Sequence, residues 1–159
     1  MSAICHNPDK PEQIATKAQK QKAKPLVNID LFVADLMFMT PEGAILARPA
    51  STVRAGEERW VARRLADLGI PILRTIRGEG TFEGADAAWL DPHTVLVGRG
   101  LRTNAEGVRQ VSATLQEMGV AVIEIDLPCG TMHLMDILRF ADRDLALAWP
   151  GRLAARARC

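Results

Sequence analysis

Residues 82–97 read FEGADAAWLDPHTVLV, and the fold is predicted outward from them. Two apolar segments, Ala87–Leu90 and Thr94–Val97, have the length and composition of β-strands. Asp91-Pro92-His93 separates them, and proline and aspartate favour tight turns. The stretch therefore predicts a β-hairpin that is preceded by two acidic residues.

A helix and a third strand follow this hairpin in the sequence. Thr103 and Glu106 have the spacing of a capping box, which predicts that a helix begins there. Gly119 is a typical residue just past a helix end, and the apolar run Val120–Ile125 predicts another strand. The segment is therefore a strand–strand–helix–strand unit.

The same order of elements occurs once before this unit and begins again after it. Asp35, Asp86 and Asp136 hold the same place in the first predicted strand of each unit, at spacings of 51 and 50 residues. The other predicted elements are strands at Leu31–Met39, Ala44–Ala47 and Ile70–Ile76, a helix near 55–68, and a last hairpin of Leu134–Phe140 and Leu145–Trp149. The sequence thus predicts an α/β fold of repeated units that cover one another, because units this small cannot bury a core alone.

The repeat also predicts which polar residues lie together. Aligned on the three aspartates, Glu83 and His133 are equivalent, so a common axis would bring Asp35, Glu83 with Asp86, and His133 to one level. Carboxylates such as Glu83 and Asp86 accept paired hydrogen bonds from a planar guanidinium, and histidine suits acid–base work. The alternative is a turn whose acidic side chains only accept backbone N–H groups. Burial of such groups is costly unless they are paired, and their repetition in three units favours a site.

Two arginines occur where the predicted helices begin. Arg54 precedes the first helix and Arg102 the second. Backbone N–H groups at a helix start favour anions, so the two guanidinium groups are candidates for holding a substrate carboxylate. The alternative interpretation is an exposed arginine at the start of each helix.

Composition excludes several classes of function. The 159-residue chain has 48% hydrophobic and 25% charged residues, the usual mix for a globular protein. Its net charge of +1 lacks the basic excess of a nucleic-acid-binding surface. No apolar run reaches the roughly 18 residues that span a bilayer, and no signal peptide is evident. We therefore expect a cytoplasmic protein with no nucleic-acid or membrane partner.

The chain divides by composition into two parts. Residues 1–28 hold five lysines, three prolines and few large apolar residues, which predicts a flexible N-terminal segment. Residues 29–159 hold the repeated units and are predicted to form the domain. The three cysteines are too few and too scattered for a disulfide scaffold, and no residues have convincing metal-ligand spacing, so no metal site is expected.

These residues resemble the guanidino-modifying superfamily with the pentein fold, which includes dimethylarginine dimethylaminohydrolases, arginine deiminases and amidinotransferases. The resemblance runs from about Phe32 to Trp149 and fits the dimethylarginine dimethylaminohydrolase pattern best. It implies a partial propeller of ββαβ units, with two complete units and the hairpin of a third. The segments that carry it, in family order, are Phe32-Val-Ala-Asp35, Arg48-Pro49, Arg54-Ala-Gly-Glu57, Glu83-Gly-Ala-Asp86, Arg102-Thr-Asn-Ala-Glu-Gly107 and His133-Leu134.

The resemblance implies a mechanism without a cofactor. Asp35 and Glu83 would bind the substrate guanidinium, and Arg54 and Arg102 its carboxylate. His133 would be the general acid and then the base that activates water. A cysteine thiolate would attack the guanidinium carbon, and hydrolysis of the intermediate would give citrulline.

The nucleophile of the family is missing from its expected place. It comes well after the histidine in a longer chain, whereas this sequence ends 26 residues after His133. Cys129 and Cys159 do not match its position, so the chain resembles a fragment without the nucleophile. The spacing His133-x-x-Asp136 replaces the His-x-Asp of arginine deiminases and amidinotransferases, which leaves the substrate open.

Three interpretations therefore remain. The chain is an enzyme or enzyme fragment acting on a guanidino compound, a non-catalytic guanidine-binding or interaction protein, or an α/β domain whose polar repeat is structural. The expected partners are arginine or a methylarginine, together with a further copy of the chain or a missing C-terminal half. Units without neighbours would leave apolar strand surface exposed, which predicts self-association.

Overall fold

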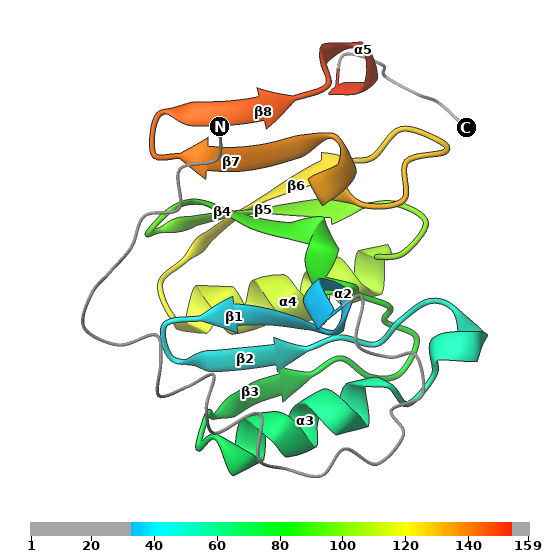
Figure 1. Ribbon diagram of the computed structural model, residues 1–159, viewed down its shortest axis with the longest axis vertical. Helices are drawn as coiled ribbons and strands as arrows, with labels where there is room; N and C mark the ends of the chain where they lie inside the picture. The colour runs from blue at the N-terminus through cyan, green and yellow to red at the C-terminus, as the bar shows by residue number, and fades with distance from the viewer. Residues whose placement is uncertain (1–32, 154–159) are drawn as a thin grey trace, which may run out of the picture. The chain divides into compact units, whose positions relative to one another are not determined.

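The structure is a computed structural model that describes residues 33–153 (Figure 1). The predicted flexible segment 1–28, the start of the strand predicted at Leu31 and the terminal Cys159 lie outside the described residues. Among residues 33–153, no helix is long and apolar enough to cross a membrane.

The first sheet has three strands with one helix between the second and the third. It consists of β1 (Met37–Thr40), β2 (Gly43–Leu46) and β3 (Ile72–Thr75), hydrogen-bonded in that order. β1 and β2 are antiparallel, and β2 and β3 are parallel. The connecting helix α3 (Glu58–Asp67) packs on β2 and β3 and buries Leu65 against them. One apolar face therefore holds the helix on the sheet.

The second sheet repeats this arrangement. It consists of β4 (Ala87–Asp91), β5 (Thr94–Arg99) and β6 (Ala121–Asp126), again with an antiparallel and then a parallel pair. Helix α4 (Ala105–Glu117) connects β5 to β6. The predicted strand–strand–helix–strand order is thus present twice, with boundaries that differ from the prediction by a few residues.

A two-stranded sheet and a short helix complete the described chain. The sheet pairs β7 (Leu138–Asp142) with β8 (Leu145–Ala148) in antiparallel fashion, and α5 (Pro150–Leu153) follows. In Figure 1 the two larger sheets and this hairpin follow one another in chain order along the vertical direction. Residues 33–153 have a mixed α/β fold of three separate sheets, none of which closes on itself. The predicted propeller symmetry stays a prediction.

The main core lies between α4 and both larger sheets. Val111 and Leu115 of α4 are fully buried together with Ile45 of the first sheet and Val95 and Val97 of the second. The rings of Phe38 and Trp89 stack between the two sheets, with 5.7 Å between their centroids. The two sheets therefore share one core rather than folding around separate ones.

The repeated aspartates lie in short helical turns, not in strands as predicted. Asp35 belongs to α2 (Val33–Leu36), Asp86 to η2 (Gly84–Asp86) and Asp136 to η3 (Leu134–Asp136), and a strand begins directly or shortly after each turn. The prediction of strands was wrong here because a short apolar run fits a helical turn as well as a buried strand.

The predicted capping box is also corrected. The N-cap of α4 is Asn104, whose side-chain oxygen accepts a hydrogen bond from the Gly107 N–H at 2.8 Å. The hydroxyl of Thr103 donates instead to the buried carboxylate of Asp86. A buried carboxylate requires donors, so Thr103 is directed away from the helix.

The β7–β8 hairpin exposes large apolar side chains. Leu145, Leu147 and Trp149 are 53%, 60% and 57% exposed, and Phe140 is 36% exposed. We call these four residues the hairpin apolar surface. The guanidinium of Arg152 lies over the Trp149 ring, 5.2 Å from its centroid, and the side chains remain largely exposed, in agreement with the prediction of exposed apolar strand surface.

Candidate active site

Three short turns bring the predicted catalytic residues together. α2 contacts η2, and η2 contacts η3. Asp35 lies within α2, Glu83 immediately precedes η2 and His133 immediately precedes η3. Glu83 and His133, 50 positions apart, therefore meet because each precedes the equivalent turn of its unit, whereas Asp35 comes from within the first of these turns.

The centre of the cluster is a histidine–carboxylate pair. His133 Nε2 and Glu83 Oε2 are 2.8 Å apart, and both side chains are almost completely buried. Asp35 Oδ1 lies 4.0 Å from the same imidazole nitrogen. The predicted convergence of Asp35, Glu83 and His133 is what the geometry of the described residues gives.

The surroundings of this pair favour its charged forms. Burial raises the pKa of Glu83, but the hydrogen bond from His133 and the nearby charges of His133, Arg102 and Arg54 outweigh it and lower that pKa overall. Burial likewise lowers the pKa of His133, but the hydrogen bond to Glu83 and the neighbouring carboxylates outweigh it and raise it. The two shifts favour an imidazolium beside a carboxylate, which is a charge-assisted hydrogen bond.

A guanidinium group already lies against the two carboxylates. Arg54, at the end of η1 (Thr52–Arg54), has its Nη1 2.7 Å from Asp35 Oδ2 and 3.8 Å from Glu83 Oε2. Its Nη2 lies 2.9 Å from Glu57. Burial opposes the charge of Arg54, but the hydrogen bonds to Asp35 and Glu57 outweigh it and raise its pKa. The Asp35–Glu83 pair thus binds a guanidinium in this structure.

The second predicted arginine lies on the other side of Glu83. Arg102 Nη1 is 4.0 Å from Glu83 Oε1, and the Arg102 side chain is 28% exposed. It therefore contacts the cluster loosely and remains accessible. Arg54 and Arg102 together place two positive charges beside the buried acids.

Asp86 lies behind the cluster rather than in it. It is fully buried, and its carboxylate accepts hydrogen bonds from the Thr103 hydroxyl at 2.5 Å and from the Leu134 N–H at 2.9 Å. Burial raises its pKa to about 6, and the two hydrogen bonds only partly offset this. Asp86 joins η2 to η3 and to the start of α4, and its role as a substrate contact stays a prediction.

Sequence reasoning missed two residues that support the site. The Thr103 hydroxyl donates a hydrogen bond to the Asp86 carboxylate and accepts one from the Glu83 backbone N–H at 3.2 Å. It therefore helps to hold both acidic residues in position. Glu57 orients Arg54 through its carboxylate. The three-residue spacing of Arg54 and Glu57 could have indicated the second contact, because residues three apart face each other on a helical turn.

The donor atoms of Asp35, Glu83 and His133 could also surround a metal ion, since they lie within 4.8 Å of one another. Imidazole and carboxylate are common ligands of zinc. However, the guanidinium of Arg54 already contacts Asp35, and Arg102 adds a second positive charge beside Glu83. Both charges oppose a bound cation, so the cluster suits an organic guanidinium better than a metal.

The chain is similar to a known protein family and to two curated enzymes. The family described as "Arginine deiminase" matches residues 3–157. The chain is similar to N(G),N(G)-dimethylarginine dimethylaminohydrolase of Streptomyces coelicolor, with 33% identity over 104 residues, covering 65% of this chain and 39% of the relative. The enzyme of the same description from Pseudomonas aeruginosa is 30% identical over 118 residues, covering 74% and 46%. The chain thus spans less than half the length of these curated relatives.

Solved structures show the same fold. The Pseudomonas aeruginosa dimethylarginine dimethylaminohydrolase in complex with citrulline matches with a TM-score of 0.68 and 29% identity, covering 76% of this chain and 46% of that one. The N-terminal domain of ArgZ, a cyanobacterial arginine dihydrolase, matches with a TM-score of 0.71 and 18% identity, covering 81% and 47%. At that identity the second match concerns the fold alone.

Proposed function

We propose that this chain supplies the guanidinium-binding and acid–base half of a hydrolase, because it belongs to the arginine deiminase family of the guanidino-modifying pentein superfamily. The proposed reaction is the conversion of a methylarginine to citrulline and an amine, as the name of its curated relatives suggests. The observation that carries the proposal is the buried cluster of Asp35, Glu83 and His133 with a guanidinium against its two carboxylates.

The contacts of Arg54 support the proposed mode of substrate binding. A substrate guanidinium would take the place of the Arg54 group and donate to Asp35 and Glu83. The released Arg54, together with Arg102, would then face the substrate carboxylate, because guanidinium groups pair with carboxylates in two parallel hydrogen bonds. A ligand with a guanidinium and a carboxylate thus satisfies every charge of the site.

His133 would move the protons of the reaction. A thiolate attacks the guanidinium carbon, and the carbon–nitrogen bond breaks as the imidazolium of His133 donates its proton to the departing amine. His133 then takes a proton from water, the water oxygen bonds to the carbon, and the carbon–sulfur bond breaks to release citrulline. The proton that the substrate guanidinium carried passes to the amine, which leaves as an ammonium ion. Glu83 holds the imidazole in place at 2.8 Å. No step requires a cofactor.

We propose that the thiolate comes from outside this sequence. Cys129, which is the only cysteine among residues 33–153, is exposed in the turn after β6 and does not belong to the Asp35–Glu83–His133 group. The curated relatives are more than twice as long as the part of them that matches. The alternatives are a non-catalytic guanidine-binding protein and a chain that uses arginine itself, as a deiminase or an amidinotransferase does.

Two measurements test the proposal. Calorimetric titration should show binding of N(G),N(G)-dimethylarginine and arginine to the purified chain, with Glu83→Gln weakening it by tenfold or more and the exposed control Arg99→Gln leaving it within about twofold. Citrulline should form only when the chain is extended with, or mixed with, the C-terminal half of the Pseudomonas aeruginosa relative.

Several outcomes separate the alternatives. Binding without citrulline in the extended protein would leave a non-catalytic guanidine-binding protein. Robust citrulline formation by the chain alone would contradict the proposal that the attacking thiolate comes from outside this sequence. If the Glu83 and Arg99 substitutions changed the binding affinity equally, Glu83 would have only a structural role in its turn. The cytoplasmic location remains a prediction, which microscopy of a tagged protein would check.

A further inference from the structure

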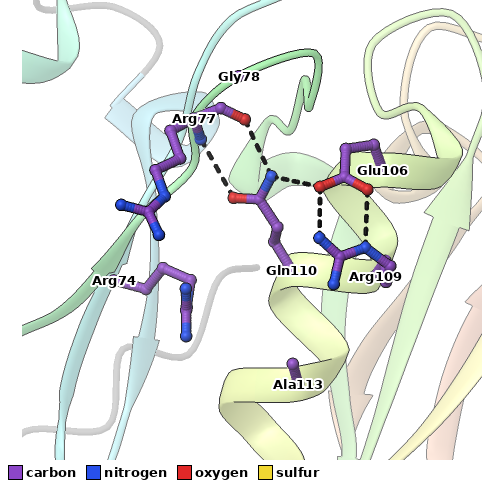
Figure 2. Close-up of a pocket in the computed structure, with 7 residues that line it drawn as sticks. All are labelled: Arg74, Arg77, Gly78, Glu106, Arg109, Gln110 and Ala113. Carbon is purple, nitrogen blue, oxygen red and sulfur yellow. Dashed lines mark hydrogen bonds and ion pairs between the residues drawn. The ribbon is translucent and has the colours of Figure 1, made fainter.

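A polar cavity lies outside the cluster of Asp35, Glu83 and His133. It has a volume of about 340 Å³ and opens between the end of β3 and one face of α4 (Figure 2). It shares no residue with the candidate active site. Its lining is formed by Arg74, Arg77, Gly78, Glu106, Arg109, Gln110 and Ala113.

A buried glutamine fixes the two walls of this cavity relative to each other. Gln110 of α4 is only 7% exposed, and its side-chain oxygen accepts a hydrogen bond from the Arg77 N–H at 3.1 Å. Its side-chain nitrogen donates to the Arg77 carbonyl at 2.9 Å and to Glu106 at 2.8 Å. The Gln110 amide thus joins α4 to the segment that follows β3, so the two walls of the cavity are held together by hydrogen bonds.

One of the three arginines is neutralised within the cavity. Arg109 donates two hydrogen bonds to Glu106, at 2.7 and 2.6 Å. The hydrogen bonds from Arg109 and Gln110 lower the pKa of Glu106 to about 2. Glu106 therefore stays ionised at neutral pH, and this pair contributes no net charge.

The other two arginines leave positive charge facing the cavity. Arg74 is half-buried, and its Nε donates to the Thr114 hydroxyl at 2.6 Å, which orients the guanidinium. Arg77 is exposed, and its guanidinium makes no hydrogen bond or ion pair with residues 33–153. Neither Arg74 nor Arg77 forms an ion pair with an acidic residue of the described chain. Figure 2 shows both side chains on the β3 side of the cavity, opposite the Glu106–Arg109 pair.

We propose that this cavity binds a small doubly charged anion through Arg74 and Arg77. Guanidinium groups recognise phosphate and carboxylate oxygens by paired, charge-assisted hydrogen bonds. The volume is at the lower end of the roughly 300–1,000 Å³ of ligand cavities, which fits a small molecule. A phosphate group and a dicarboxylate share this chemistry. The proposal does not depend on the function proposed for the Asp35–Glu83–His133 cluster.

Calorimetric titration of the purified chain with inorganic phosphate, malonate and acetate tests the proposal. In a low-salt buffer we expect phosphate, malonate or both to bind at one site per chain, and acetate to bind at least tenfold more weakly. Binding of phosphate alone identifies a phosphate-bearing ligand, and binding of malonate alone a dicarboxylate. Failure of both dianions to bind, or equal binding of acetate, would overturn the proposal.

Substitutions locate the binding. Arg77→Gln and Arg74→Gln should each weaken binding about tenfold, because each removes a charged donor. Arg63→Gln, an exposed arginine of α3 outside the cavity, makes the same charge change and should alter the affinity less than twofold. Equal losses in all three variants would mean unspecific attraction and would contradict the site. The side-chain amide resonances of Gln110 should shift on binding, whereas thermal midpoints should confirm that the variants fold.

The two sites are distinguishable experimentally. Glu83→Gln should abolish guanidinium recognition and leave dianion binding unchanged. Arg77→Gln should do the reverse. If Glu83→Gln weakened dianion binding as strongly as Arg77→Gln, the anion would be binding at the catalytic cluster and the proposed second site would be wrong.

Discussion

Glu83 and His133 depend on each other for their charges. Replacing Glu83 by glutamine removes a carboxylate that raises the pKa of His133, so that pKa should fall. Titration of the His133 ring protons by NMR measures this shift directly. An unchanged pKa in the Glu83→Gln protein would show that the hydrogen bond at 2.8 Å does not govern the imidazole.

The same pair makes stability depend on pH in a defined window. Folding lowers the pKa of Glu83, so the stability that Glu83 contributes is lost as pH falls below 4.5. Folding raises the pKa of His133, so the stability that His133 contributes is lost as pH rises beyond 6.5. The difference in thermal midpoint between the native protein and Glu83→Gln should therefore be largest between these limits. A difference in thermal midpoint that is largest above pH 9 would contradict the predicted directions of the two pKa shifts.

Arg54 has two opposed effects on ligands. It competes with an incoming guanidinium for Asp35 and Glu83, but it is also the proposed partner of a ligand carboxylate. Arg54→Gln should therefore bind free guanidinium ion several-fold more tightly and arginine several-fold more weakly, as measured by calorimetry. Arg59→Gln, an exposed neighbour, should change neither affinity. A loss of both affinities would mean that Arg54 only maintains the shape of the site.

The spacing of the repeat predicted which residues of the cluster meet, because equivalent points of neighbouring units lie close together. It could not predict that Arg54 pairs with Asp35, since the conformation of a long side chain depends on packing. The role of Thr103 was hidden for a different reason. A threonine at a helix start has two possible partners, and only the buried charge of Asp86 decides between them.

The elements were predicted less well where they are short. α3 and α4 agree with the sequence pattern within a few residues, because their apolar faces have a clear helical period. The turns α2 and η3 were predicted as parts of the strands Leu31–Met39 and Leu134–Phe140, since so short a segment has no readable period. Those turns position the site, so its local geometry was the least predictable part.

Gly84 allows two of these turns to approach each other. A Cβ at this position would meet the backbone oxygens of Met37 and Ala34, which cannot move as a side chain does. Gly84→Ala should destabilise the protein by about 1–3 kcal/mol in denaturant unfolding and weaken guanidinium binding, because η2 must move away from α2. Gly151→Ala meets only ordinary contacts with Trp149 and should change stability by about 0.5 kcal/mol or less. Equal stability of both variants would contradict the tight approach.

The hairpin apolar surface should govern how the whole molecule associates. Large uncovered apolar surfaces favour association in water. Sedimentation should therefore show concentration-dependent self-association of the chain, and Leu147→Lys should reduce it. Leu101→Lys, a comparably exposed leucine outside the hairpin, is the control. If both variants sediment like the unchanged protein, the surface is not a site of association.

The turns that hold the candidate active site also fasten the last sheet to the rest of the fold. The His133–Glu83 hydrogen bond and the bond from the Leu134 N–H to Asp86 join η3 to η2. Loss of the His133 proton weakens the first of these bonds, so local opening of β7 and β8 becomes easier as pH rises. Amide hydrogens of β7 and β8 should then exchange with solvent faster as His133 loses its proton, whereas the exchange of those in β5 should not depend on the protonation of His133.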